Sequence, residues 1–165
     1  TEISGAIAGV QLKRLDQLTA VTKHHKQRLV QLLRNVTKKY PITLQRIHDP
    51  AGDIGISLIM FVPEGKGQIF SEALHAEGIT NWWLHNSAGH SYHTSYQIIK
   101  QRTLNPKQYP FRHPANRKIE YSQDALPQTR SLLDRAIHFD ITPFMTDEDL
   151  EMIAEGVEKV AYWLL

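Results

Sequence analysis

Residues 54–62 read Ile-Gly-Ile-Ser-Leu-Ile-Met-Phe-Val. Apolar side chains recur at every second position from Ile54 to Val62, which is the period of a half-buried β-strand. Residues 42–48 show the same period of two, with Ile42, Leu44, Arg46 and His48 at the alternate positions. Between the two segments, residues 49–53 read Asp-Pro-Ala-Gly-Asp, a composition typical of a turn. Two strands joined by a turn predict an antiparallel pair.

Segments whose apolar residues have helical spacing precede and follow this pair of strands. Residues 1–40 carry apolar side chains at intervals of three and four, which predicts one long helix that Pro41 ends. Further helices are predicted over residues 69–74, 126–136 and 146–165, short strands near 82–85 and 137–141, and a long loop over 100–122. The expected fold class is α+β: a small, mostly antiparallel sheet with helices packed on it and one long N-terminal helix that projects. We divide the chain into that helix, 1–40, and a small domain, 41–165.

The composition excludes several classes of protein. Of 165 residues, 41% are hydrophobic and 22% charged, which is the balance of a cored domain. With no cysteine, thiolate metal sites and thiol nucleophiles are excluded, and a reducing compartment such as the cytoplasm is expected. The net charge of +2 and the short basic clusters do not indicate nucleic-acid binding. No stretch is apolar enough to span a membrane, and the N-terminus does not read as a secretory signal.

Three histidines, His85, His90 and His93, form the densest group of potential metal ligands, with His113 and His138 further off. Their spacing fits neither one helix face nor one strand face, and a structural zinc ion normally takes four nitrogen or sulfur ligands. We therefore expect no metal site. Packing or hydrogen bonding within an aromatic loop is the favoured interpretation, with hydrogen bonding to a substrate as the alternative.

Other motifs do not complete a catalytic site. Gly65-Lys66-Gly67 lacks the first glycine and the Ser or Thr of a nucleotide-binding phosphate loop, and no Gly-x-Ser-x-Gly occurs. His138 lies between Asp134 and Asp140, but such a grouping is common by chance in a charged segment. Composition and spacing alone therefore predict an α+β domain without a complete catalytic apparatus.

Four segments of the chain resemble the DegT/DnrJ/StrS-type sugar aminotransferases. Residues 2–16, Glu-Ile-Ser-Gly-Ala-Ile-Ala-Gly-Val-Gln-Leu-Lys-Arg-Leu-Asp, resemble the passage from that family's large domain into its small one. Leu74-His75-Ala76-Glu77-Gly78-Ile79 resembles its small-domain helix and turn. Leu126-Pro127-Gln128-Thr129 with Ile137-His138, and residues 145–150 onward, resemble its closing pattern.

The resemblance implies the C-terminal small domain of a cytoplasmic, homodimeric enzyme that depends on pyridoxal phosphate and transfers an amino group to a keto sugar or nucleotide sugar. The cofactor is then bound by a lysine of an absent large domain, so we assign no catalytic residue in this chain. The helix 1–40 becomes an interdomain helix whose small residues, Ser4 to Gly9, pack on that domain. By position, Trp83, His90 and Tyr92 match the family's substrate-binding contribution.

Two alternatives stay open. One is a sugar dehydratase of the same family, in which another residue replaces the cofactor lysine. The other is a non-catalytic binding or scaffold module that uses residues 82–117 as its contact surface. The residue at the cofactor position upstream of Thr1 distinguishes the aminotransferase from the dehydratase. Lysine there predicts an aminotransferase, and histidine predicts a dehydratase.

Overall fold

The computed structural model describes residues 1–86, 91–115 and 120–165. Its centre is a four-stranded sheet with strand order β1-β2-β4-β3, in which every pairing is antiparallel. The strands are β1 (Thr43–Leu44), β2 (Ser57–Phe61), β3 (Trp82–Trp83) and β4 (Ala136–Asp140). The alternation from Ile54 to Val62 thus yields a central strand, and its predicted antiparallel partner at residues 42–48 is confirmed as the shorter β1. The predicted α+β class is confirmed.

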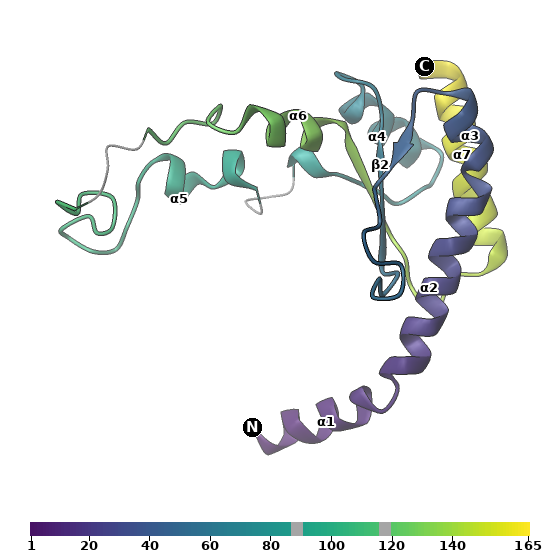
Figure 1. The fold of residues 1–165 in the computed structure, drawn as a ribbon, viewed down its shortest axis with the longest axis horizontal. Helices are drawn as coiled ribbons and strands as arrows, with labels where there is room; N and C mark the ends of the chain where they lie inside the picture. The colour runs from purple at the N-terminus through teal and green to yellow at the C-terminus, as the bar shows by residue number, and fades with distance from the viewer. Residues whose placement is uncertain (87–90, 116–119) are drawn as a thin grey trace.

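Three helices cover one face of this sheet (Figure 1). They are α2 (Leu15–Leu32), α4 (Gly67–Ala76) and α7 (Asp147–Leu164), and α7 packs against both of the others. The core between sheet and helices is apolar. Its fully buried members include Leu58, Met60 and Phe139 from the strands and Phe70 from α4. We call the sheet with these three helices the body.

Local signals fix where two of the helices begin and end. At the start of α7, the Thr146 hydroxyl accepts a hydrogen bond from the Asp149 amide, and the Asp149 carboxylate accepts one from the Thr146 amide. This reciprocal pair satisfies two amides that the helix leaves free. After α4, Gly78 takes a φ of 82°, and the Ile79 amide bonds back to the Leu74 carbonyl. A residue with a Cβ is strained at that angle, so glycine ends the helix there.

The N-terminal helix is not continuous, which corrects the prediction of one helix over 1–40. The chain forms α1 (Glu2–Leu12), α2 and α3 (Arg34–Lys39), with a change of direction between α1 and α2 (Figure 1). At this break the Arg14 amide bonds to the Gln11 carbonyl, three residues back instead of four. No residue of α1 is buried, so nothing in the described chain holds α1 in line with α2, which packs on α7.

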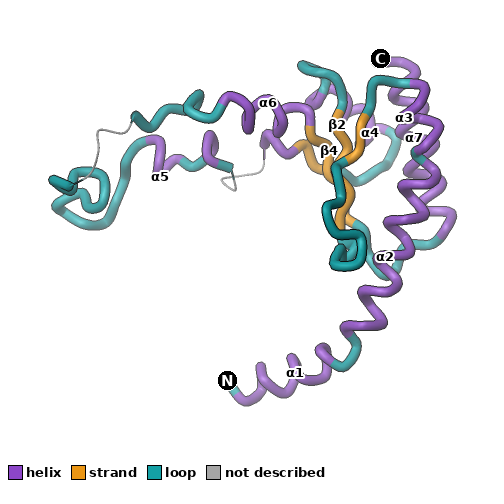
Figure 2. The backbone as a smooth tube through the Cα atoms, viewed as in Figure 1, coloured by secondary structure: helices purple, strands orange, loops and turns teal. Residues whose placement is uncertain are grey.

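A long arm, residues 84–126, leaves the sheet after β3 and returns at α6 (Pro127–Arg135), which leads into β4. Figure 2 shows that its described parts are mainly loop. Three short helical segments interrupt the described loop. These segments are η1 (Leu84–Asn86), η2 (Tyr92–Thr94) and α5 (Tyr96–Ile99). The loop predicted over 100–122 is confirmed for its described residues. Both the arm and α1 project from the body (Figure 1).

Candidate functional site

A cavity of about 700 Å³ lies where the arm joins the body. Its walls come from β3, η1, η2, α5 and residues 123–130, so residues near the start of the arm meet residues at its end and in α6. The lining residues are Trp83, His85, Asn86, His93, Thr94, Tyr96, Ile99, Lys100, Gln123, Asp124 and Arg130. Aromatic and imidazole rings form one part of this wall and polar or charged groups the other. We call this the root cavity.

The Trp83 side chain of the root cavity is held in place by a hydrogen bond and by ring stacking. Its indole Nε1 donates a 2.7 Å hydrogen bond to the Asp134 carbonyl oxygen, and its ring stacks on His85 at 4.7 Å between centroids and 14° between planes. Gly67 lies directly beneath, where an added Cβ would collide with that carbonyl oxygen and with Nε1. The second glycine of Gly65-Lys66-Gly67 therefore serves close packing under Trp83.

His85 and His93 form a packed pair next to Trp83. Their ring centroids are 4.7 Å apart, and His93, only 9% exposed, donates from Nε2 to the His85 carbonyl oxygen at 3.1 Å. Desolvation, reinforced by His93, lowers the pKa of His85 from its ordinary 6.5, and the nearby Asp134 carboxylate does not reverse this. His85 is therefore neutral at pH 7.

One polar atom of this pair has no partner among the described residues. The Nδ1 atom of His85 is buried and makes no hydrogen bond, and its distance of 3.6 Å from the Asp134 carboxylate is too long for one. A neutral histidine beside a carboxylate does not form an ion pair. A buried ring nitrogen without a partner is costly, so a ligand or water that approaches it gains a hydrogen bond.

Charged and amide groups complete the root cavity. Asp124 forms an ion pair with Arg130, so both charges are compensated within the wall. Asn86, Lys100 and Gln123 are exposed and line the opening. This arrangement combines flat ring surfaces with donors and acceptors around them, which suits a small polar ligand that has an apolar face.

The three predicted substrate-binding residues do not lie together in one site of the described structure. Trp83 lines the root cavity, and Tyr92 belongs to η2 beside His93 but does not line it. His90 lies outside the described residues. Sequence reasoning grouped His85 and His93 with the potential metal ligands and favoured packing, which the ring contacts confirm. Within the described ranges no three metal-ligating side chains come together.

The group formed in the sequence by His138, Asp134 and Asp140 is separated in the structure. His138 lies on β4 with its Nδ1 3.8 Å from the Asp140 carboxylate, which accepts a hydrogen bond from the Trp82 indole. Asp134 lies instead beside His85. The three side chains His138, Asp134 and Asp140 therefore do not form a catalytic set.

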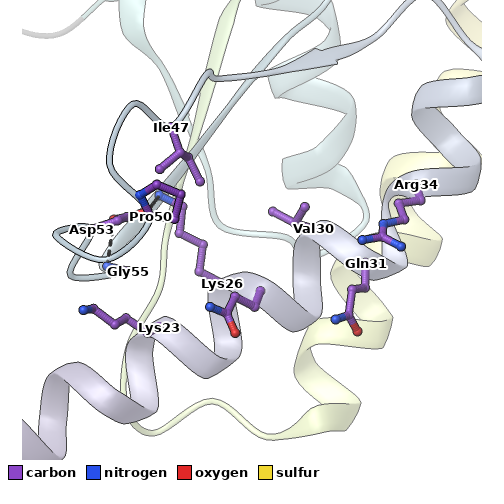
Figure 3. Close-up of a pocket in the computed structure, with 10 residues that line it drawn as sticks. Lys23, Lys26, Val30, Gln31, Arg34, Ile47, Pro50, Asp53 and Gly55 are labelled. Carbon is purple, nitrogen blue, oxygen red and sulfur yellow. Dashed lines mark hydrogen bonds and ion pairs between the residues drawn. The ribbon is translucent and has the colours of Figure 1, made fainter.

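A second cavity, of about 200 Å³, lies between α2 and the loop before β2 (Figure 3). Lys26 is buried there and pairs with Asp53 at 2.6 Å, while Lys23 donates to the Ala51 carbonyl at 2.7 Å. Desolvation opposes ionisation of Asp53, but the hydrogen bonds from Lys26 and the Gly55 amide, together with the positive charges of Lys26 and Lys23, outweigh it and lower the pKa of this carboxyl. Both lysines are engaged with the loop, so this region ties the loop to α2.

The sequence profile of the DegT/DnrJ/EryC1/StrS aminotransferase family matches residues 1–158 of the 165. The chain therefore belongs to this aminotransferase family. A search of curated proteins finds no match. No helix in the described ranges has the length and apolar character to cross a membrane.

Proposed function

We propose that this chain is the C-terminal small domain of a pyridoxal-phosphate aminotransferase that acts on a keto sugar or nucleotide sugar. The root cavity is the observation that carries the proposal, because its chemistry suits a sugar. The C–H face of a sugar ring packs on aromatic and imidazole surfaces such as Trp83 and His85, while hydroxyl groups bond to side chains such as Asn86 and Gln123. The family membership supports the amino-transfer reaction.

In this proposal the cavity residues bind and orient the sugar. Trp83, fixed by its bond to the Asp134 carbonyl, provides the rigid stacking surface. The neutral ring of His85 stacks on Trp83 and extends this flat surface. His90 and Tyr92 are proposed to add contacts from the same segment. None of these side chains is required to carry out the chemical step.

We propose that pyridoxal phosphate itself is bound outside this chain. Chemistry with this cofactor requires a lysine that binds it covalently and a carboxylate beside its ring nitrogen. In the root cavity the carboxylate, Asp124, is already paired with Arg130, and Lys100 is exposed at the opening. We therefore assign the cofactor to a large domain encoded before Thr1.

The exposed helix α1 supports such a partner. Ile3 is 75% exposed and Ile7 59%, and an added Cβ at Gly5 or Gly9 meets nothing within 4 Å. A largely apolar helix in which no residue is buried is expected to be covered by another surface. We propose that it packs on the large domain, in an enzyme that is a homodimer of the cytoplasm.

The experiment locates the cofactor lysine. The complete gene product is loaded with pyridoxal phosphate, reduced with borohydride and digested, and the modified peptide is identified by mass spectrometry. We expect a single modified lysine outside residues 1–165, and transfer of an amino group from an amino donor to a keto sugar before reduction. A modified lysine inside residues 1–165, or no modified lysine in a folded protein, would contradict the proposal. The second result is the one expected of a dehydratase or a scaffold module.

A further inference from the structure

The far end of the arm holds a separate cavity of about 300 Å³, which shares no lining residue with the root cavity. It is lined by Asn105, Lys107, Tyr109, Arg112, His113 and Pro114. The described lining contains three basic side chains and no carboxylate. We call this the tip cavity.

Hydrogen bonds within the loop hold the tip cavity in shape. The Asn105 carboxamide oxygen accepts from the Lys107 amide at 2.9 Å, and the Arg112 amide donates to the Gln108 carbonyl at 3.1 Å. Thr103 donates from its hydroxyl to the Tyr109 carbonyl at 3.0 Å and so closes the loop. The lining residues are therefore positioned by their own backbone and not by the body.

The basic groups of the tip cavity are available as donors. Lys107 and Arg112 are exposed, and their charged ends make no hydrogen bond or ion pair with the described residues. His113 accepts the Ala115 amide at Nδ1, which leaves the proton of the neutral ring on Nε2. Tyr109 packs edge-on against the His113 ring at 5.5 Å. The cavity thus offers an ammonium, a guanidinium and an imidazole N–H.

The positive charge of residues 78–119 favours binding of an anion in the tip cavity. Residues 78–119 contain six Lys and Arg and no Asp or Glu. The rest of the chain then holds 13 basic and 17 acidic residues, so the positive charge of this protein is concentrated in the segment that forms β3 and most of the arm. Arginine and lysine are the side chains that proteins use most for phosphate.

We propose that the tip cavity binds the phosphate or diphosphate group of a small metabolite. Its volume admits a group of that size, and its described lining carries three basic side chains and no carboxylate. A nucleic acid is disfavoured as the occupant because its binding depends on many phosphates met along a basic face, whereas the chain as a whole carries only +2. The inference does not rest on the function proposed above, since it concerns binding without turnover.

The test measures binding of inorganic pyrophosphate to the full-length protein by isothermal titration calorimetry. The double variant Lys107→Gln/Arg112→Gln is compared with the charge-matched double variant Lys13→Gln/Lys38→Gln, whose changes lie in the N-terminal helical region. We expect saturable binding whose Kd rises at least tenfold in the first variant and changes less than twofold in the second. Circular dichroism confirms that each variant is folded.

Three results would overturn the proposal. They are absence of saturable pyrophosphate binding, an equal loss of affinity in both double variants, and displacement of pyrophosphate by a 20-nucleotide single strand at a lower phosphate concentration. His113→Phe gives an independent check, because it retains an aromatic ring but removes the Nε2 donor. We expect this variant to raise the Kd several-fold, and an unchanged Kd would exclude the imidazole from the site.

Discussion

The body and the arm are stabilised by different interactions. In the body, side chains such as Phe139 and Leu58 are 1% exposed and lie in one continuous apolar core. Among the described residues of the arm only His93 is buried, and ring contacts such as Phe111 with Tyr121 and hydrogen bonds within the loop maintain its shape. Burial of apolar side chains therefore stabilises the body, whereas ring contacts and local hydrogen bonds maintain the described parts of the arm.

Among the variants that test this comparison, Phe139→Ala is expected to change the free energy of unfolding most. Phe139→Ala removes a buried ring from the centre of the core and leaves a cavity, so it should lower the free energy of unfolding by about 3–5 kcal/mol. Phe144→Ala is the matched control, because Phe144 is 87% exposed, and it should change stability by less than about 0.5 kcal/mol. Urea unfolding followed by circular dichroism measures both. Equal losses would show that the division into body and arm misplaces the core.

The body could be predicted from sequence because its signals are local. Alternation over residues 54–62 gives β2, and Thr146 with Asp149 gives the start of α7. The root cavity could not be predicted in this way, since Trp83 is held by the carbonyl of Asp134, 51 residues away. The signal for the tip cavity was present in the sequence as the absence of acidic residues over 78–119.

The ion pair of Lys26 and Asp53 tests the edge of the body. Lys26→Met leaves the Asp53 carboxylate without its partner, and we expect a loss of about 2 kcal/mol, less than for a fully buried pair because the Asp53 side chain is 23% exposed. The lowered pKa of Asp53 means that the pair stabilises the fold fully above pH 3.8 and loses this contribution as the pH falls further. Unfolding at pH 7 and pH 3 should therefore show a smaller acid effect in Lys26→Met than in the wild type. Lys13→Met, at an exposed position, should keep the wild-type pH dependence, and an identical profile for all three proteins would refute this role.

Gly67 lies at the boundary between the two regions. Gly67→Ala places a methyl group against the Asp134 carbonyl and the Trp83 indole, so it should lower stability by about 1–2 kcal/mol and displace Trp83. The near-ultraviolet circular dichroism of tryptophan detects that displacement. Gly5→Ala is the control, because a Cβ there meets no atom within 4 Å and improves helix propensity. If both variants are as stable as the wild type, the close contact beneath Trp83 does not constrain the site.

The smallest effect is expected at His85 within the arm. Its lowered pKa means that the unfolded chain takes up a proton more readily, so stability is retained above pH 6.5 and falls as the pH drops below that value. His85→Gln should flatten the stability profile between pH 7.5 and pH 5, measured as Tm by calorimetry. His48→Gln, at an exposed histidine, should leave the profile as it is. A profile that is equally steep with and without His85 would contradict the burial of this ring.

We propose above that the sugar binds in the root cavity. The most direct test compares the steady-state kinetics of full-length enzyme variants at two adjacent tryptophans. Trp83 lines the cavity, whereas Trp82 is 58% exposed and bonds to Asp140. With saturating amino donor, Trp83→Ala should raise the KM for the keto sugar at least tenfold with a smaller change in kcat, and Tyr96→Ala at the cavity wall should also raise KM without a change in Tm. Trp82→Ala should leave KM within twofold of the wild type. A KM that is unchanged in Trp83→Ala, or raised equally by both tryptophan variants, would contradict the account.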